Sequence, residues 1–403
     1  MDVVNGVSRA DGAALVVLAT GAGKTTVGAE LCRNAGRVLW VAHRSELVAQ
    51  ARERLNLFGV RDARVVTPQS LRPGDDLACD IAVFDECHHY PKSNKWADAA
   101  CSIKASGAKL VGLTATPQRA DGQSLGGVFD CIVQGPSPYS LMKDGHLCDV
   151  DVFSPGLAQG GFAMEPRDAW VQYAGNRRTV VFCSSIASAE KECALWGEGE
   201  VIHGKLSAVE RARRLASPWR VLFNVFVLTE GWDLPEVKCA ILARGCGSLG
   251  TYLQIAGRIL RPHPSYSRAV LIDLVGASRE HGHPLDDREW TLSGNGVAKA
   301  SAPAYAYCSS CSGLLRDSAS RCDRCGFTRE SAEARERRVD LQRLEKVLRN
   351  SAAPPHERVR RLAALGAQAK ARGYAVGWVQ HRYRAAFGQW PTREQLRAAG
   401  VRL

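Results

Sequence analysis

The 403-residue sequence has no run of about 18 consecutive apolar residues, the length that a helix needs to cross a membrane. Its first five residues lack the basic segment followed by an apolar one that marks a secretory signal peptide. Internal repeats of solenoid length and low-complexity tracts are also absent. These absences argue against a membrane partner, a secreted protein and a repeat protein, and they predict a cytoplasmic globular protein.

Length and charge indicate several domains and a polyanionic partner. A chain of 403 residues exceeds one ordinary hydrophobic core, so two or three domains are expected. The net charge of +12 is concentrated in residues 331–403, where 16 basic and 6 acidic residues give +10. Such a concentration is typical of an element that binds a polyanion, and a solvated helical surface is the alternative.

Short β-branched runs alternate with helical segments through the first 275 residues. The first series of predicted strands covers residues 14–19, 37–42, 63–67, 80–84 and 109–113. The series restarts at residues 179–183, 200–203, 221–227, 238–242 and 269–274. This rhythm is typical of βαβ units with a parallel sheet, so we predict two similar α/β domains in tandem. The Gly- and Pro-rich stretch 135–166 is the predicted join.

A glycine-rich turn follows the first predicted strand directly. It consists of Thr20, Gly21, Ala22, Gly23, Lys24, Thr25 and Thr26. Glycines let backbone N–H groups approach a phosphate, and the start of a helix adds a favourable dipole. We expect Lys24 to reach the β- and γ-phosphates of a nucleotide and the Thr25 hydroxyl to ligate Mg²⁺. A glycine-rich turn with an incidental lysine is the alternative.

Two adjacent carboxylates, Asp85 and Glu86, follow the predicted strand at 80–84. Because ligands bind at the carboxyl ends of the strands in such a sheet, both acids should lie beside the glycine-rich turn. Asp85 is expected to hold Mg²⁺ through water. Glu86 is expected to orient and deprotonate the attacking water.

Further segments follow in a recognisable order. They are residues 41–47, 67–71, 85–88, 114–117, 181–185, 229–235 and 254–261. Together with the turn at 20–26, they resemble the superfamily 2 helicases with a DECH-type box, in particular phage-type DEAD/DEAH-like and RadD-like helicases. The resemblance covers about residues 14–330. It implies two tandem RecA-like lobes of the P-loop type with parallel sheets, and an ATP-dependent motor.

The segment at 254–261 resembles the family's motif VI. Arg258 and Arg261 are three residues apart, so they lie on one face of a helix in the second lobe. A guanidinium group on the γ-phosphate would stabilise the charge of the transition state once the lobes close. We therefore expect both to act as arginine fingers and Gln254 to sense the γ-phosphate, and two solvated arginines are the alternative.

The resemblance also implies other contacts. Gly231 and Asp233 are expected to contact the nucleotide. The residues expected to contact the nucleic-acid backbone are His43, Arg44, Thr67, Arg119, His203 and Thr229. The family's adenine-recognising glutamine has no counterpart among the 23 residues before Lys24, so triphosphate binding is predicted more firmly than ATP selectivity.

Four of the 14 cysteines form two C-x-x-C pairs, Cys308 with Cys311 and Cys322 with Cys325, separated by ten residues. Two such pairs can supply four thiolates to one tetrahedral Zn²⁺, and four thiolates leave no position for a catalytic water. The pairs therefore predict a structural zinc site. A pair of disulfides and an iron–sulfur centre are the alternatives.

The tail mixes aromatic residues with arginines at residues 373–391. Its arginines are expected to hold phosphates, and exposed aromatics would stack on bases. However, the helical spacing of Trp378, Phe387 and Trp390 favours a core for a small helical unit. A charged helix is predicted before this region, at residues 329–350.

We predict four parts: a first RecA-like lobe at 1–147, a second at 148–300, a four-cysteine zinc module at 301–330, and a basic helical tail at 331–403 that binds nucleic acid. The predicted function is an ATP- and Mg²⁺-dependent helicase or translocase acting on single-stranded or forked DNA. The alternatives are an RNA-directed motor and a zinc-containing nucleic-acid-binding protein with a vestigial motor. A separate nuclease, or a repair or replication protein, is left open as a partner.

Overall fold

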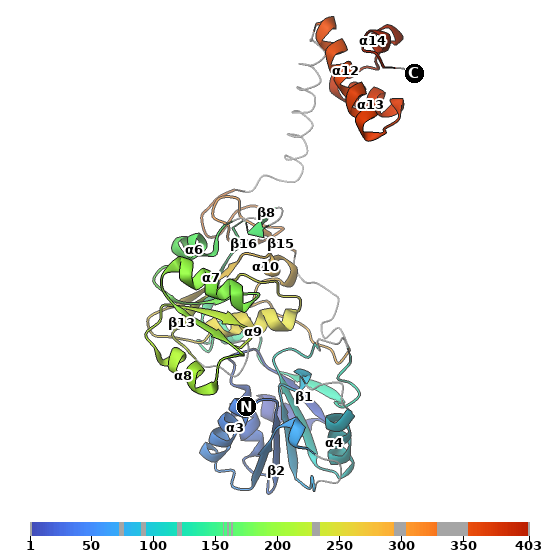
Figure 1. Cartoon of the computed structure of the whole chain (residues 1–403). Helices are drawn as coiled ribbons and strands as arrows, with labels where there is room; N and C mark the ends of the chain where they lie inside the picture. The colour runs from blue at the N-terminus through green and yellow to red at the C-terminus, as the bar shows by residue number, and fades with distance from the viewer. Residues whose placement is uncertain are drawn as a thin grey trace. The chain divides into compact units, whose positions relative to one another are not determined.

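The computed structural model describes residues 2–71, 76–89, 94–118, 123–155, 157–158, 161–162, 164–227, 234–293, 304–328 and 354–401. These residues form two compact units, Met1–Phe327 (unit 1) and Thr328–Leu403 (unit 2). Unit 1 contains two α/β lobes and a small cysteine-bearing module, and unit 2 is helical (Figure 1). Within the ranges given, no helix is long and apolar enough to cross a membrane.

The first lobe is built on a six-stranded sheet whose order is β3-β2-β4-β5-β1-β6, with every neighbouring pair parallel. Its strands are β1 (Ala14–Val17), β2 (Val38–Ala42), β3 (Ala63–Val66), β4 (Ile81–Asp85), β5 (Lys109–Thr114) and β6 (Cys131–Gln134). Its helices are α1 (Asp2–Arg9), α2 (Lys24–Cys32), α3 (Ser45–Leu57) and α4 (Asn94–Ala105), with short 3₁₀ turns η1 (Pro68–Ser70) and η2 (Cys87–His89). The strands β1, β2 and β4 are buried at every position, because apolar clusters cover both faces of the sheet.

Register brings the carboxyl ends of three central strands of the first lobe to the same edge. Val17 at the end of β1 pairs with Thr114 at the end of β5. Asp85 at the end of β4 pairs with Leu113 of β5 and with Ala42 of β2. The loops that follow β1, β4 and β5 therefore lie side by side.

The second lobe repeats this architecture with the order β11-β12-β10-β13-β14-β7, again with parallel neighbours. Its sheet strands are β7 (Asp149–Phe153), β10 (Arg178–Phe182), β11 (Glu200–His203), β12 (Val221–Val225), β13 (Val237–Leu242) and β14 (Arg268–Asp273). The short strands β8 (Leu157–Ala158) and β9 (Gly161–Phe162) form a separate pair. The helical elements between residues 138 and 281 are α5 (Pro138–Lys143), α6 (Pro166–Ala169), η3 (Trp170–Ala174), α7 (Ile186–Trp196), α8 (Ala208–Ala216), α9 (Leu249–Ile259) and α10 (Ala277–His281).

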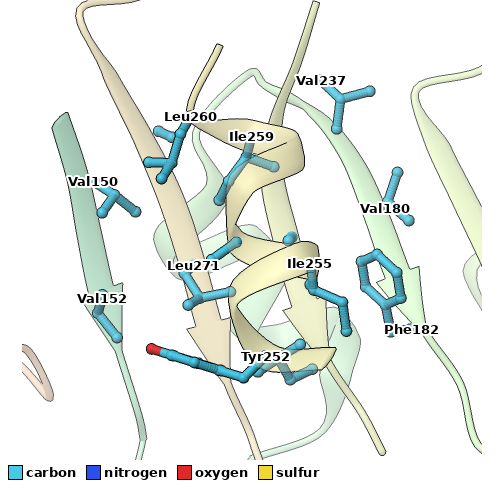
Figure 2. Close-up of a cluster of buried hydrophobic side chains, with 14 of the residues drawn as sticks. Val150, Val152, Val180, Phe182, Val237, Tyr252, Ile255, Ile259, Leu260 and Leu271 are labelled. Atoms are coloured by element: carbon cyan, nitrogen blue, oxygen red, sulfur yellow. The ribbon is translucent and has the colours of Figure 1, made fainter. Parts of the chain in front are cut away.

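Helix α9 lies across the second sheet. The Ser248 side chain accepts a hydrogen bond from the Thr251 N–H and so caps the start of the helix. Tyr252, Ile255 and Ile259 project from α9 toward the valine and leucine side chains of the sheet (Figure 2). The helix is therefore held against the sheet by one apolar face, leaving another face for contacts with the first lobe.

The structure confirms the predicted pair of RecA-like α/β lobes. Each predicted strand is present within one or two residues of its expected ends. Two edge strands, β6 and β7, are additions, and β7 lies inside the Gly- and Pro-rich stretch expected to be the join. Val150 and Val152 are buried at alternate positions of β7, which is the pattern of an edge strand with one covered face.

A segment from the predicted second lobe packs on the first one. Trp290 and Leu292 lie against the apolar cluster beneath the first sheet. The Ser124 hydroxyl and the Leu125 N–H both donate to the Leu292 carbonyl, at 2.6 and 3.2 Å. The Gln134 amide donates to the carbonyl of Arg288 at 2.9 Å. The chain therefore crosses back from the second lobe to the first after α10, although the exact domain limits remain a prediction.

The cysteine module contains the antiparallel strands β15 (Tyr305–Tyr307) and β16 (Leu314–Arg316). It joins the second lobe through a β-bridge between Phe153 and Gly313 and a 2.8 Å hydrogen bond from the Ser154 N–H to the Ser312 carbonyl. The module therefore packs directly on the end of β7.

Unit 2 consists of helices α12 (Pro355–Arg372), α13 (Val376–Phe387) and α14 (Arg393–Ala398). They enclose a core of Leu362, Ala369, Val379, Tyr383, Phe387 and Leu396. The charged helix predicted at 329–350 lies outside the described residues.

Candidate active site

The glycine-rich turn has the backbone shape that phosphate binding requires. Gly21 and Gly23 have φ values of 89° and 82°, which residues with a side chain rarely adopt. Helix α2 begins at Lys24, and no side chain caps it at Gly23. Because the first N–H groups of a helix need acceptors, this end of α2 can bind an anion.

Lys24 and the two predicted acids lie together, as expected from the sequence. The Lys24 Nζ is 3.2 Å from Oε1 of Glu86, and both side chains are largely buried. Asp85 is also buried, and burial together with the neighbouring Glu86 charge raises its pKa to about 7. Two carboxylates held away from water fit a divalent cation, whose charge would stabilise both. Asp85 and the nearby Thr25 hydroxyl are the residues that would hold Mg²⁺.

Glu86 has an unusual backbone conformation. Its φ is 48°, in the left-handed region that side-chain-bearing residues avoid, and such strain costs about 1–3 kcal/mol. The strained turn follows the last residue of β4 and directs the Glu86 carboxylate toward Lys24. Strain at this position indicates that the orientation of Glu86 matters to the site.

A hydrogen-bonded chain connects the two lobes through His88. The Thr114 hydroxyl donates to the Thr116 carbonyl at 2.7 Å and lies 2.8 Å from His88 Nδ1. This arrangement places the ring proton on Nδ1, so that Nε2 accepts from the Gln254 amide at 3.3 Å. Gln254 also lies 3.3 Å from Nε2 of His89. These hydrogen bonds link β5 and the turn η2 of the first lobe with α9 of the second.

A cavity of about 440 Å³ lies between the lobes. The site residues that line it are Thr20, Gly21, Gly23, Lys24, Thr25, Thr26, Asp85, Glu86, Arg258 and Arg261. Both predicted arginine fingers therefore face the same cavity as the glycine-rich turn and the two acids. Ala22 packs against the apolar clusters of both lobes. Gln254 contacts His88 and His89 and is not among the cavity's lining residues, so its role as a γ-phosphate sensor stays a prediction.

Lys238 is a further residue that supports this site, and sequence reasoning does not identify it. Its side chain is fully buried in β13, and its Nζ donates to the carbonyls of Ile259, at 3.2 Å, and Arg261. The Cys148 N–H donates to the Leu260 carbonyl at 2.7 Å. These contacts hold the end of α9, which carries Arg258, and the segment directly after it, which carries Arg261. The sequence placed both arginines on one helix, but Arg261 lies beyond the end of α9. A lone lysine inside an apolar strand is the only signal of this role.

The structure describes four of the six residues that are predicted to contact nucleic acid. His43 follows β2, and its ring lies 5.0 Å from that of His89. Arg44 precedes α3 and Thr67 precedes η1, so both lie beyond the carboxyl ends of first-lobe strands. His203 ends β11 of the second lobe. The remaining two, Arg119 and Thr229, lie outside the described residues, as do the predicted nucleotide contacts Gly231 and Asp233.

The four clustered cysteines have the geometry of a metal site. All four Sγ atoms lie within 4.8 Å of one another. Cys308 Sγ is 3.6 Å from that of Cys325, and Cys311 Sγ is 3.8 Å from that of Cys322. A tetrahedral ion with metal–sulfur bonds of about 2.3 Å requires sulfur–sulfur distances of about 3.8 Å. The cysteines therefore fit one tetrahedral metal ion.

Arg324, which lies between the second pair of cysteines, fastens this module to the second lobe. Its guanidinium group pairs with the Asp151 carboxylate and lies 4.2 Å from the centre of the Phe153 ring. Arg324 and Arg268 together lower the pKa of Asp151, against the effect of its burial. The cysteine module and strand β7 thus share a charged and aromatic contact.

The sequence matches two protein families. Residues 167–263 match the family described as helicase conserved C-terminal domain. Residues 2–78 and 63–119 match the family described as type III restriction enzyme, res subunit.

Individual proteins are similar over most of the chain. The protein irc3 of Schizosaccharomyces pombe, named as a mitochondrial ATP-dependent helicase, is 27% identical over 326 aligned positions, and the match covers 66% of this chain and 54% of irc3. A 51.5 kDa protein of Lactococcus phage (isolate 7-9) is 23% identical over 376 aligned positions, and the match covers 81% of each protein. The chain spans about half the length of its fungal relatives, 54% and 48%.

Among solved structures, the ATP-dependent Type ISP restriction-modification enzyme LlaBIII bound to DNA has a similar fold. Its TM-score is 0.53 at 14% sequence identity, and the match covers 68% of this chain and 27% of that one. At this identity the likeness concerns the fold.

Proposed function

Because the chain belongs to the superfamily 2 helicases, we propose that it is a nucleic-acid-dependent ATPase that translocates along or unwinds DNA. One observation carries this proposal: Arg258 and Arg261 of the second lobe line the same cavity as Lys24, Asp85 and Glu86 of the first. A triphosphate in this cavity would contact both lobes at once. Its hydrolysis would then change how firmly the lobes hold each other.

Each residue of the cavity has a distinct task in this mechanism. Mg²⁺ held by Thr25 and Asp85 would neutralise charge on the β- and γ-phosphates. Lys24 would turn from Glu86 to the phosphates, because a triphosphate carries more negative charge than one carboxylate. Glu86 is then able to accept a proton from the attacking water.

The lobes communicate through the His88–Gln254 contact. Gln254 moves with α9, and His88 is bound to Thr114, the first residue of the segment 114–117 that resembles a motif of the family. Loss of the γ-phosphate would release the arginines and separate these partners. Nucleic acid held by His43, Arg44 and Thr67 on one lobe and by His203 on the other would then be gripped differently in the two states. This alternation is the proposed basis of movement along the strand.

DNA is the proposed substrate because the motif pattern resembles phage-type and RadD-like helicases. An RNA-directed motor of the same fold is the second candidate. Zn²⁺ is the proposed ion of the four-cysteine module, since four thiolates in a tetrahedron are its common structural ligand set. The cytoplasmic location and a nuclease, repair or replication partner remain predictions from the sequence.

The proposal is tested by measuring ATP and GTP hydrolysis with no nucleic acid, single-stranded DNA, duplex DNA, forked DNA and single-stranded RNA. We expect stimulation by DNA, and a loss of turnover of at least about 100-fold in Lys24→Ala and Glu86→Gln. Lys104→Ala is the matched control, because Lys104 also pairs with an acid, Asp130, but on the surface of the first lobe.

Three outcomes would contradict parts of this proposal. Absence of hydrolysis with every nucleic acid, together with DNA binding that is unchanged in Lys24→Ala, would indicate a vestigial motor. Stronger stimulation by RNA than by DNA would assign the chain to the second candidate. Equal hydrolysis of GTP and ATP would remove ATP selectivity but leave the motor in place.

A further inference from the structure

Helix α13 of unit 2 has two chemically different faces. Val379, Tyr383 and Phe387 are buried and form one side of the core of the unit. The other side of the helix carries His381, Arg382 and Arg384, which are all exposed, and Trp378 lies at its margin, partly buried against the core. The sequence left open whether the tail aromatics form a core or meet a ligand. In the structure the tail aromatics fall into two groups, because Phe387 belongs to the core whereas Trp390 is 45% exposed.

The exposed side of α13 holds two groups in which arginine lies over an aromatic ring. In the first, the Arg382 guanidinium is 5.4 Å from the centre of the Trp378 ring, and the half-exposed Tyr374 ring is 4.9 Å from the same tryptophan. Trp378 itself is partly buried against the core, so its orientation is fixed. Such a rigid ring needs little further ordering when a ligand stacks on it or on its neighbour.

The second group surrounds Trp390. The Arg384 guanidinium is 4.6 Å from the centre of its ring, and the His381 ring meets it edge-on at 5.0 Å. His381 is three residues after Trp378, so the two groups occupy adjacent turns of α13. We call Tyr374, Trp378, His381, Arg382, Arg384 and Trp390 the aromatic–arginine face.

The charge of unit 2 fits a polyanion. Residues 354–401 contain nine Lys and Arg residues and two acids, Glu357 and Glu394. Neither acid belongs to α13, since Glu357 lies on α12 and Glu394 on α14. The aromatic–arginine face therefore combines flat rings with positive charge and contains no carboxylate.

We propose that the aromatic–arginine face binds single-stranded DNA, with bases stacked on Tyr374 and Trp390 and phosphates held by Arg382 and Arg384. The choice of DNA rests on the proposed function. Base stacking on aromatic rings is the main attraction that separates an unpaired strand from a duplex, whose base faces are already covered. Tyr374 lies just before α13 and Trp390 just after it, with Arg382 and Arg384 on the helix between them. This order of rings and positive charge suits the bases and phosphates of one strand better than a flat anionic surface.

The first test measures the affinity of the full-length chain for oligo-dT, oligo-rU and blunt duplex DNA by fluorescence anisotropy without nucleotide. We expect the double variant Tyr374→Ala/Trp390→Ala to weaken oligo-dT binding about tenfold or more, with a smaller change for duplex. Both rings are exposed, so the core of unit 2 is retained, which circular dichroism can verify. Tyr139→Ala is the matched control, because Tyr139 is also an exposed ring beneath a cation, Lys143, but belongs to unit 1.

Salt dependence separates the phosphate contacts from stacking. The affinity for oligo-dT falls with salt, and the logarithm of the affinity is linear in the logarithm of the salt concentration. The variant Arg382→Gln/Arg384→Gln should lower the magnitude of this slope by about 1.4, because each phosphate contact on a single strand contributes about 0.7. The aromatic variant should leave the slope unchanged. Equal losses for oligo-dT and duplex in the aromatic variant would overturn the stacking proposal, and a preference for oligo-rU would overturn the assignment to DNA.

Photocross-linking locates the contact directly and does not depend on a variant. An oligonucleotide with 5-iododeoxyuridine should cross-link to peptides that contain Tyr374 or Trp390. Cross-links confined to unit 1 would overturn the proposal. The Lys24→Ala variant should give the same unit 2 cross-links, so the aromatic–arginine face can succeed or fail independently of the ATPase.

Discussion

A Cβ atom placed on Gly257 would lie 2.3 Å from the Cβ of Thr20, because helix α9 passes directly over the glycine-rich turn of the first lobe. A Cβ on Gly250, two turns earlier on the same face of α9, would lie 3.0 Å from the Thr116 hydroxyl. The two glycines thus allow α9, which carries Arg258, to approach the loops after β1 and β5 of the first lobe.

The variant Gly257→Ala should therefore lose ATPase activity without losing stability. Alanine favours the helix by up to about 1 kcal/mol, but its methyl group would push α9 away from Thr20. A displacement near 1 Å at such a site lowers turnover by about 100-fold. Steady-state ATPase rates and thermal unfolding would be compared with those of Gly247→Ala, whose added Cβ meets nothing within 4 Å. Full activity in Gly257→Ala would show that hydrolysis does not require this close contact.

Replacing Lys238 with methionine should lower both stability and turnover. Methionine has a similar shape but no donor, so the buried carbonyls of Ile259 and Arg261 would lose a charged partner, at about 1–3 kcal/mol. The end of α9 would also become less ordered, which should reduce kcat. Lys109→Met is the matched control, because Lys109 Nζ donates to the Ala10 carbonyl at 2.6 Å far from the cavity. An equal fall of kcat in both variants would show that general destabilisation is the cause.

Stability should decrease below about pH 6.5 through His283. Burial lowers the pKa of His283 below its ordinary value, and Nδ1 accepts a hydrogen bond from the Leu285 N–H, which a second ring proton would displace. Between the folded and unfolded pKa values the unfolded chain binds more protons, so the free energy of unfolding falls as the pH falls through this window. The midpoint of thermal unfolding between pH 5 and 8 should change less steeply in His283→Gln than in the parent protein. Parallel curves would assign the acid sensitivity to other groups, and His356→Gln on the exposed start of α12 serves as the control.

Removal of the metal from the four-cysteine module should destabilise the second lobe. The module is bound to β7 through Gly313 and Arg324, so its collapse would remove contacts from the edge of the second sheet. We expect stoichiometric zinc in the purified protein, and loss of zinc with a lower unfolding midpoint in Cys322→Ser. The control is Cys101→Ser, because Cys101 is exposed and lies outside the cluster. Iron in the elemental analysis, with visible absorption, would favour the iron–sulfur alternative.

The sequence predicts the fold and the centre of the site because both depend on local patterns. Apolar runs of strand length, followed by glycines or acids, are enough to place Lys24 and Asp85 at the same edge of the sheet, beyond the carboxyl ends of β1 and β4. The strained backbone of Glu86 and the burial of Lys238 depend on the packing of distant segments, and neither has a local signature. The sequence also does not predict the surroundings of Trp378, Phe387 and Trp390. Helical spacing alone does not say which of these rings faces the core and which faces water.

The return of residues 288–292 to the first lobe has a mechanical consequence. The polypeptide connects the lobes after β6 and again through Arg288 and Leu292, so two separate connections join them. Two bodies fastened at two points can pivot mainly about the line between those points, and they are restrained from sliding or twisting freely. We therefore expect the cavity to open mainly by rotation of one lobe about the axis that passes through these two connections.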